Sequence, residues 1–336
     1  MDALRIHWPV GPYHLLNYGN AAGDGHAITR TREALAAYVE YDEGAPLDFQ
    51  FRAPMSYEPT PGASRRVLFT MFESPDMPTA CIDRVRKADV LIVPSRFCQR
   101  IFRQYTPAPI YVCPLGHDPV PYRARTIGTP FRWLWVGANN LRKGFQTIAA
   151  AWDILVRAGL RNAELYLKTT PLGRSHEGKR ERYDSLIFDS RNITREALDR
   201  LYDSAHAFAY PTLGEGFGLT LLEAMSAGLP AVATEYGGHL DFTTPRTTRY
   251  LPYKLKRMAP GEGAHSGAPD QRYEFAAVNP ETLAAAMLDV MADYPAAVAM
   301  AERAAKHVAS FTWDACARRL ATILRHEARR AERKAA

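Results

Sequence analysis

Residues 214–225 constrain the fold of this chain more than any other stretch. They read Gly-Glu-Gly-Phe-Gly-Leu-Thr-Leu-Leu-Glu-Ala-Met, so that Glu215 and Glu223 stand with seven residues between them and a Gly-aromatic-Gly turn follows the first glutamate. The apolar run at 207–211 predicts a buried strand before this stretch, and the run at 229–234 predicts another after it. Strand, glycine turn, helix and strand in this order form a parallel βαβ unit.

The turn in this unit has the properties of a ligand site. Glycine lets a ligand approach the backbone closely, and the free N–H groups at a helix N-terminus suit a phosphate or a developing anion. Glu215 and Glu223 would flank that point and accept hydrogen bonds from hydroxyl groups. The alternative, from spacing alone, is that Glu215 is an N-terminal charge on the helix and Glu223 a surface residue.

The same stretch resembles the E-x7-E signature of the retaining, family-four-like glycosyltransferases, which have a GT-B fold. In that family the segment reads close to E-G-F-G-L-x-x-x-E-A-M-A-x-G-x-P-V-V-A-T. This chain matches it at Glu215, Gly216, Phe217, Gly218, Leu219, Glu223, Ala224, Met225, Gly228 and Pro230. The resemblance implies an α/β protein with two Rossmann-like domains that face each other across a cleft. It also implies a C-terminal helix that crosses back to the N-terminal domain.

Length and composition agree with two domains. The chain has 336 residues, of which 47% are hydrophobic and 23% charged, as in soluble globular proteins. Residues 119–130 are rich in Pro, Arg, Thr and Gly and lack periodicity, which predicts a linker. We expect an acceptor-side domain at 1–122, a nucleotide-sugar-binding domain at 123–310, and a crossover helix with a basic tail at 311–336.

Two candidate site elements lie in the N-terminal half. Gly23 and Gly25 precede a predicted helix at about 27–41, and by the resemblance they match a glycine loop near the donor phosphates; a flexible turn and helix cap is the alternative. Glu73 follows a predicted strand at 67–72, and ligands of α/β sheets bind at the carboxyl ends of strands. The resemblance gives Glu73 the place of a His or Glu that faces the donor sugar. A loop carboxylate that caps the following helix is the alternative.

Two adjacent cations, Arg142 and Lys143, come just before a predicted helix at about 145–158. Cationic side chains and a helix N-terminus together suit a diphosphate, and simple surface charge is the alternative. By the resemblance, Lys143 matches the lysine of the family's G-R-x-x-x-x-K-G element. The arginine of that element is absent because Ala138 stands there, so Arg142 would compensate.

The resemblance implies a role for each candidate. Glu215 would contact the donor sugar, Glu223 the ribose hydroxyls, and the loop after a predicted strand at 186–189 the nucleotide base. The predicted catalytic residues are Glu215, Lys143, Arg142 and Glu73. The predicted donor-binding residues are Glu223, Gly216, Phe217, Gly218, Leu219, Thr220, Gly23, Gly25, Arg191 and Asn192.

The function implied is retaining transfer of a sugar from a UDP- or GDP-linked donor to a hydroxyl of a saccharide or lipid-linked glycan. The chain has no D-x-D sequence, and we expect neither a metal ion nor another cofactor. One alternative is a phosphorylase or epimerase of the same fold. Others are transfer to a modified base of a nucleic acid and a non-catalytic protein that binds nucleotide sugars. His117, in a segment that resembles the end of the family's first domain, is assigned a structural or linker role.

Charge and cysteine content bear on the location of the protein. The net charge is +6, and the basic C-terminal tail and an arginine-rich N-terminal half suit an anionic membrane surface or a phosphate-bearing acceptor. No signal peptide and no apolar run of about 18 residues is visible. We expect a cytoplasmic protein, either free or peripheral to the inner face of the membrane. Its four cysteines lack metal-ligand spacing and suit a reducing compartment: Cys81, Cys98, Cys113 and Cys316.

Overall fold

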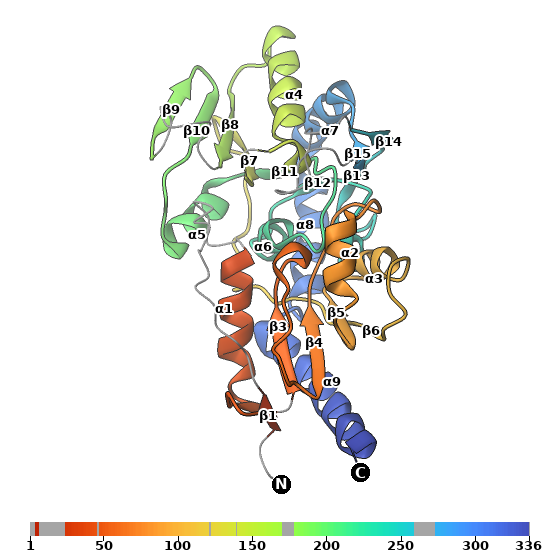
Figure 1. Ribbon diagram of the computed structural model, residues 1–336. Coiled ribbons are helices and arrows are strands. Elements are labelled where there is room, and N and C mark those ends of the chain that lie inside the picture. The colour runs from red at the N-terminus through yellow and green to blue at the C-terminus, as the bar shows by residue number, and fades with distance from the viewer. Residues whose placement is uncertain are drawn as a thin grey trace.

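The structure is a computed structural model that describes residues 4–6, 24–45, 47–120, 122–138, 140–169, 178–258 and 273–335. The chain has two halves, each built around a sheet of mainly parallel strands (Figure 1). Both sheets are buried on two faces, so their strands read as nearly continuous apolar runs.

The N-terminal half contains a four-stranded parallel sheet in the order β3-β4-β5-β6. Its strands are β3 (Leu47–Phe51), β4 (Arg65–Phe69), β5 (Val90–Val93) and β6 (Ile110–Val112). A short parallel pair, β1 (Leu4–Ile6) and β2 (Val39–Tyr41), lies beside it. The helices of this half are α1 (Asp24–Leu35), α2 (Thr79–Val85) and α3 (Arg96–Phe102), with a 3₁₀ turn at Pro54–Ser56.

The C-terminal half contains a seven-stranded sheet in the order β13-β12-β11-β7-β8-β10-β9, in which only β9 is antiparallel to its neighbour. Along the chain these are β7 (Phe131–Val136), β8 (Ala163–Lys168), β9 (Arg180–Tyr183), β10 (Leu186–Asp189), β11 (Ala207–Tyr210), β12 (Ala231–Thr234) and β13 (Arg249–Leu251). Outside this sheet, β14 (Lys254–Arg257) pairs with β15 (Glu274–Ala277).

Helices cover both faces of the larger sheet. On one face, α4 (Phe145–Arg157) and α7 (Pro280–Ala292) share a core cluster with β7 and β8; on the other, α5 (Arg195–Ser204) and α6 (Leu219–Ser226) pack on β11. The remaining helix of this half, α8 (Tyr294–Val308), packs against α6. In the described part of the chain no single helix is long and apolar enough to cross a membrane, and α7 with α8 passes that test only as a pair bent by 98°.

The predicted crossover helix is confirmed. α9 (Trp313–Ala335) leaves the C-terminal half and packs against α1 and β4, beside the N-terminal sheet (Figure 1). The thiols of Cys113 and Cys316 lie 3.9 Å apart where α9 passes the end of β6. Further along α9, the fully buried carboxylate of Glu327 accepts hydrogen bonds from Arg65 and from the Tyr111 hydroxyl.

Glu327→Gln is expected to lower the free energy of unfolding by about 3 kcal/mol, because it leaves the Arg65 guanidinium without its buried counter-charge. Burial alone would raise the pKa of Glu327, but Tyr111 and Arg65 hold it below its ordinary value, so the charge is present at neutral pH. Urea unfolding at pH 7 measures the change. Glu332→Gln makes the same charge change at an exposed position of α9 and should stay within about 0.5 kcal/mol of wild type. Equal effects of the two substitutions would contradict a stabilising role for the buried pair of Glu327 and Arg65.

Several predicted boundaries were wrong. The helix expected at 27–41 is α1, Asp24–Leu35, and the chain then turns into β2, which is stabilised by pairing with β1. Gly25 therefore lies in the first turn of a helix rather than in a loop, and Gly23 falls outside the described residues. The strand expected at 67–72 spans Arg65–Phe69, so Glu73 stands four residues beyond its end.

Candidate active site

The turn between β11 and α6 lies against the N-terminal half of the protein. A Cβ atom added at Gly214 would stand 2.5 Å from the carbonyl oxygen of Glu73, and one added at Gly216 would stand 2.9 Å from the Cβ of Met71. Gly218 has a φ of 107° and precedes the first residue of α6. The packing of the N-terminal half therefore requires glycine at 214 and 216, and the backbone conformation of the turn favours it at 218.

Glu215 is the centre of a cluster of charged side chains. Its side chain is 7% exposed, and one carboxylate oxygen lies 2.5 Å from the Lys143 ammonium and 3.2 Å from the Arg142 guanidinium. The same Arg142 nitrogen lies 3.7 Å from a carboxylate oxygen of Glu73. The structure thus brings together all four residues that the sequence predicted as catalytic, from both halves of the chain.

The charges of this cluster set the protonation state of Glu215. Burial alone would raise the pKa of its carboxyl group, but Lys143 and Arg142 outweigh burial and hold the pKa below its ordinary value. Glu215 is therefore an anion at neutral pH, and it neutralises part of the positive charge of Lys143 and Arg142.

The backbone fixes Arg142 and Lys143 beside the turn. They end a 3₁₀ turn, Leu141–Lys143, which is capped by the side chain of Asn140, and Gly144 follows with a φ of 76°. A Cβ atom at Gly144 would meet the carbonyl oxygen of Pro211 at 2.0 Å, so only glycine fits. The carbonyl oxygen of Arg142 accepts hydrogen bonds from the backbone N–H of Leu213 and the hydroxyl of Thr212.

Glu223 is buried, which excludes the surface role left open by the sequence. One of its carboxylate oxygens binds the guanidinium of Arg195, and the other accepts a hydrogen bond of 2.9 Å from the Tyr202 hydroxyl. Arg195 also donates to Asp199 and to the carbonyl oxygen of Asp118, the residue before the linker. Sequence reasoning missed Arg195 and Tyr202. The pattern after Thr194 predicts a helix, but it does not show that Arg195 pairs with Glu223, 28 positions later in the chain.

The C-terminal half of the chain matches a known family. Residues 130–255 match the sequence profile of the family described as Glycosyl transferases group 1. A D-inositol 3-phosphate glycosyltransferase of Corynebacterium jeikeium is 29% identical over 264 residues, which cover 70% of this chain and 57% of that protein. For the enzyme of the same name from Corynebacterium urealyticum the match covers 25% of its length. The chain thus spans less than two thirds of the length of these relatives.

Solved structures agree with the fold. The sucrose-phosphate synthase from Thermosynechococcus elongatus is similar with a TM-score of 0.67 at 16% identity, covering 97% of this chain and 99% of that one. Anabaena Alr3699/HepE in complex with UDP and glucose is similar with a TM-score of 0.63 at 13% identity, covering 97% of this chain and all of that one. Over residues 130–255 the chain is therefore similar to the group 1 glycosyl transferases. The resemblance and the two-domain GT-B fold that the sequence predicted are confirmed.

The glycosyl transferase signature is tied to the N-terminal half by hydrogen bonds that the sequence did not reveal. The buried hydroxyl of Ser95 donates to the carbonyl oxygen of Gly216 at 2.6 Å, while its oxygen accepts from the backbone N–H of Cys98 at the start of α3. The backbone N–H of Gly238 donates to the carbonyl oxygen of Glu215 at 2.7 Å. The carbonyl groups of Glu215 and Gly216 are thereby held in place.

Apart from Glu223, Gly23 and Gly25, which are described above, the predicted donor-binding residues separate into three groups. Gly216, Gly218, Leu219 and Thr220 lie beside the charged cluster, at the turn and the first residues of α6. Phe217 contributes only its backbone, because its ring is buried against Phe242 with centroids 5.2 Å apart.

Arg191 and Asn192 form the third group. They are exposed in the loop after β10, which lies two strands from β7 in the sheet. Arg191 makes a bidentate pair with the buried Asp189 carboxylate. Its contact with a nucleotide base stays a prediction. Within the described ranges no group of three or more His, Cys, Asp or Glu side chains is placed to hold a metal ion.

Proposed function

We propose that the protein transfers a sugar from a nucleoside-diphosphate sugar to an acceptor hydroxyl with retention of the anomeric configuration and without a metal ion. The observation that carries this proposal is the convergence of Arg142 and Lys143 on Glu215 at the N-terminus of α6. Two cations and a helix dipole can take the place of a metal beside a leaving diphosphate.

In the proposed reaction, the bond between the anomeric carbon and the diphosphate oxygen breaks, and the acceptor oxygen bonds to the same carbon. The acceptor proton passes to an oxygen of the leaving diphosphate, which departs from the same face. Arg142 and Lys143 stabilise the negative charge that grows on the leaving group, and each preorganised donor of this kind lowers the barrier by about 3 kcal/mol. Glu215, ionised and buried, binds sugar hydroxyls and faces the positive charge that grows on the ring.

We propose that Glu223 binds the ribose hydroxyls of the donor. Each carboxylate oxygen can accept two hydrogen bonds, so the contacts with Arg195 and Tyr202 leave acceptor capacity on both oxygens. The two partners hold the carboxylate in one orientation, which lowers the entropy cost of donor binding.

The named relatives support a UDP-linked donor and a hydroxyl acceptor in this proposal. One similar structure holds UDP and glucose, and the aligned Corynebacterium enzymes are named for transfer to D-inositol 3-phosphate. We propose a saccharide or lipid-linked glycan as the acceptor. The arginines on α3, Arg96 and Arg100, with nearby Arg103, would favour an anionic membrane surface for a lipid-linked one.

Thermal unfolding in the presence of EDTA tests the donor site. UDP, GDP and ADP, each at about 100 times its dissociation constant, should stabilise the protein by about 2.7 kcal/mol if they bind the folded state. We expect a selective shift with UDP or GDP that is weakened in Lys143→Ala and in Glu223→Gln. The absence of a shift with every nucleotide, or a shift that requires added Mg²⁺, would contradict the proposal.

A further inference from the structure

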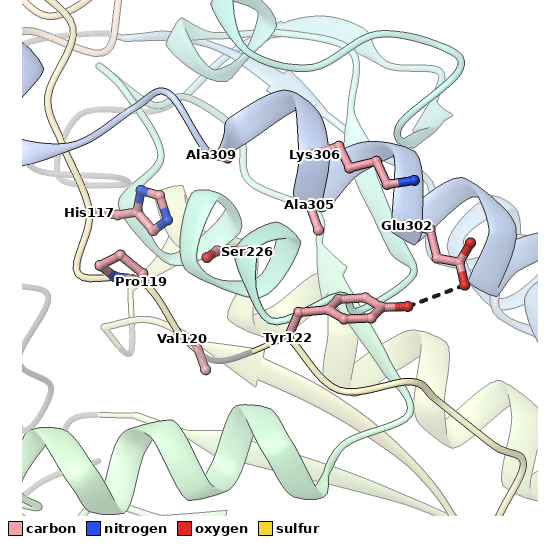
Figure 2. A pocket seen from close by; sticks show the side chains of 9 residues that line it. All are labelled: His117, Pro119, Val120, Tyr122, Ser226, Glu302, Ala305, Lys306 and Ala309. Carbon is pink, nitrogen blue, oxygen red and sulfur yellow. Dashed lines mark hydrogen bonds between the residues drawn. The ribbon is translucent and has the colours of Figure 1, made fainter.

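A cavity lies where the linker meets α6 and α8 (Figure 2). Its volume is about 550 Å³, within the usual range for small-molecule sites. Three segments line it: residues between 117 and 122 at the start of the linker, the last residue of α6, and the C-terminal part of α8 with the residue that follows it. The lining residues are His117, Pro119, Val120, Tyr122, Ser226, Glu302, Ala305, Lys306 and Ala309.

His117 gives this cavity a buried hydrogen-bond acceptor without a partner. The residue is 2% exposed, and its Nδ1 lies 2.7 Å from the carbonyl oxygen of Phe311. Because a carbonyl can only accept, Nδ1 carries the proton and Nε2 presents a lone pair. Nε2 has no hydrogen-bond partner among the described residues. A buried polar atom of this kind is normally satisfied by a ligand or by water, and Figure 2 shows the ring extending from the linker toward Ser226.

The other walls of the cavity combine an aromatic face with polar groups of several kinds. Tyr122 is 44% exposed, and its hydroxyl donates to the Glu302 carboxylate at 3.2 Å, which holds the ring in place (Figure 2). The Ser226 hydroxyl and the Lys306 ammonium offer donors, while Glu302 and His117 offer acceptors. A sugar ring has C–H groups on its face and hydroxyls around its edge, so it matches an aromatic platform surrounded by mixed donors and acceptors.

We propose that this cavity is a second saccharide site, separate from the donor site, that binds a neutral mono- or disaccharide. The sugar ring packs on Tyr122, and one of its hydroxyls donates to Nε2 of His117. The assignment does not rest on the transfer reaction, because none of the lining residues belongs to the charged cluster around Glu215.

The position of the cavity couples it to the donor site. Ser226 ends the helix that carries Glu223, and the residue after His117, Asp118, accepts a hydrogen bond from Arg195 through its carbonyl oxygen. The carboxylate of Asp118 binds Arg30 on α1 of the N-terminal half. A sugar that orders the linker therefore acts on the segment that connects both halves of the chain.

Isothermal titration calorimetry of the full chain with glucose, galactose, maltose and sucrose tests the proposal, in the presence and absence of UDP. We expect at least one sugar to bind with a dissociation constant in about the millimolar range, and we expect UDP not to displace it. Tyr122→Ala should weaken the binding at least ten-fold. His117→Asn, which keeps a donor for the Phe311 carbonyl but removes the ring nitrogen Nε2 from its position, should weaken the binding similarly.

The control is Tyr183→Ala, which removes an exposed tyrosine from β9, outside the cavity; it should leave the affinity unchanged. The proposal is overturned if no sugar binds, if UDP displaces the sugar, or if Tyr122→Ala binds like wild type. Tyr122 is exposed, so this variant can be read even where His117→Asn fails to fold. Thermal stabilisation by UDP reports the donor site separately, so failure of the second site leaves that result intact.

Discussion

Replacing Lys143 with alanine is expected to lower kcat by about 10²–10³-fold, the usual loss when one preorganised donor to a developing anion is removed. Lys143 lies 2.5 Å from Glu215 and is held by a turn in which neither Asn140 nor Gly144 can change freely. Arg142, 3.2 Å from the same Glu215 oxygen, remains in this variant, so the loss measures the effect of one of the two cations. The rate of sugar transfer under saturating donor measures the effect, with donor hydrolysis as the readout where no acceptor is known.

The same substitution should shift the acid limb of the pH profile. In the wild-type protein the pKa of Glu215 is held below its ordinary value, so the stability it contributes is present at neutral pH and is lost as the pH falls through the lowered pKa. Without Lys143, the effect of burial is opposed less strongly and the pKa of Glu215 rises. As the pH is lowered, activity and stability should therefore both begin to fall at a higher pH than in the wild-type protein.

Lys87→Ala is the matched control for this prediction. Lys87 also pairs with a glutamate, Glu58, but the two side chains are 46% and 59% exposed. Removal of such a surface pair should change stability by less than about 1 kcal/mol and leave kcat and the pH profile unchanged. If Lys143→Ala lowered kcat no more than Lys87→Ala does, Lys143 would have no role in the proposed mechanism.

The fold could be predicted from residues 214–225 because each local signal agreed with the others. The spacing of Glu215 and Glu223, the glycines between them and the flanking apolar runs all require one βαβ unit. Short elements were missed where tertiary pairing decides the structure. The residues of β2, Val39–Tyr41, continue the pattern of the preceding helix and become a strand only because β1 offers them a partner.

The sequence predicted the charged members of the site but not the groups that hold them. Arg142, Lys143 and Glu215 are recognisable because charges beside glycines and helix starts have a chemical use. Ser95 gives no such signal: it is an ordinary helix N-cap, and its second bond, to Gly216, joins residues 121 positions apart. Contacts of this kind depend on how the two halves meet, which no local pattern specifies.

Gly238→Ala is expected to destabilise the protein by about 3 kcal/mol and to lower kcat about 100-fold, the cost of displacing a catalytic group by about 1 Å. A Cβ atom at this position would stand 2.0 Å from the carbonyl oxygen of Gly216 and 2.8 Å from the Ser95 hydroxyl. Because the nearest atom belongs to the backbone, no side-chain rotation relieves the clash. The turn at 214–218 must move, which breaks the Ser95 hydrogen bond and carries Glu215 away from Lys143.

Two further variants separate displacement of the turn from simpler explanations. Gly44→Ala adds the same methyl group where the nearest atom is 3.5 Å away, and it should change stability by less than about 0.5 kcal/mol. Ser95→Ala removes the hydrogen bond to Gly216 together with the N-cap of α3 and should cost about 2 kcal/mol with a smaller loss of kcat. If Gly238→Ala lost stability but kept wild-type kcat, the turn would be a packing element alone. A loss of kcat that follows the order Gly238→Ala, Ser95→Ala, Gly44→Ala would instead show that the N-terminal half positions Glu215 for catalysis.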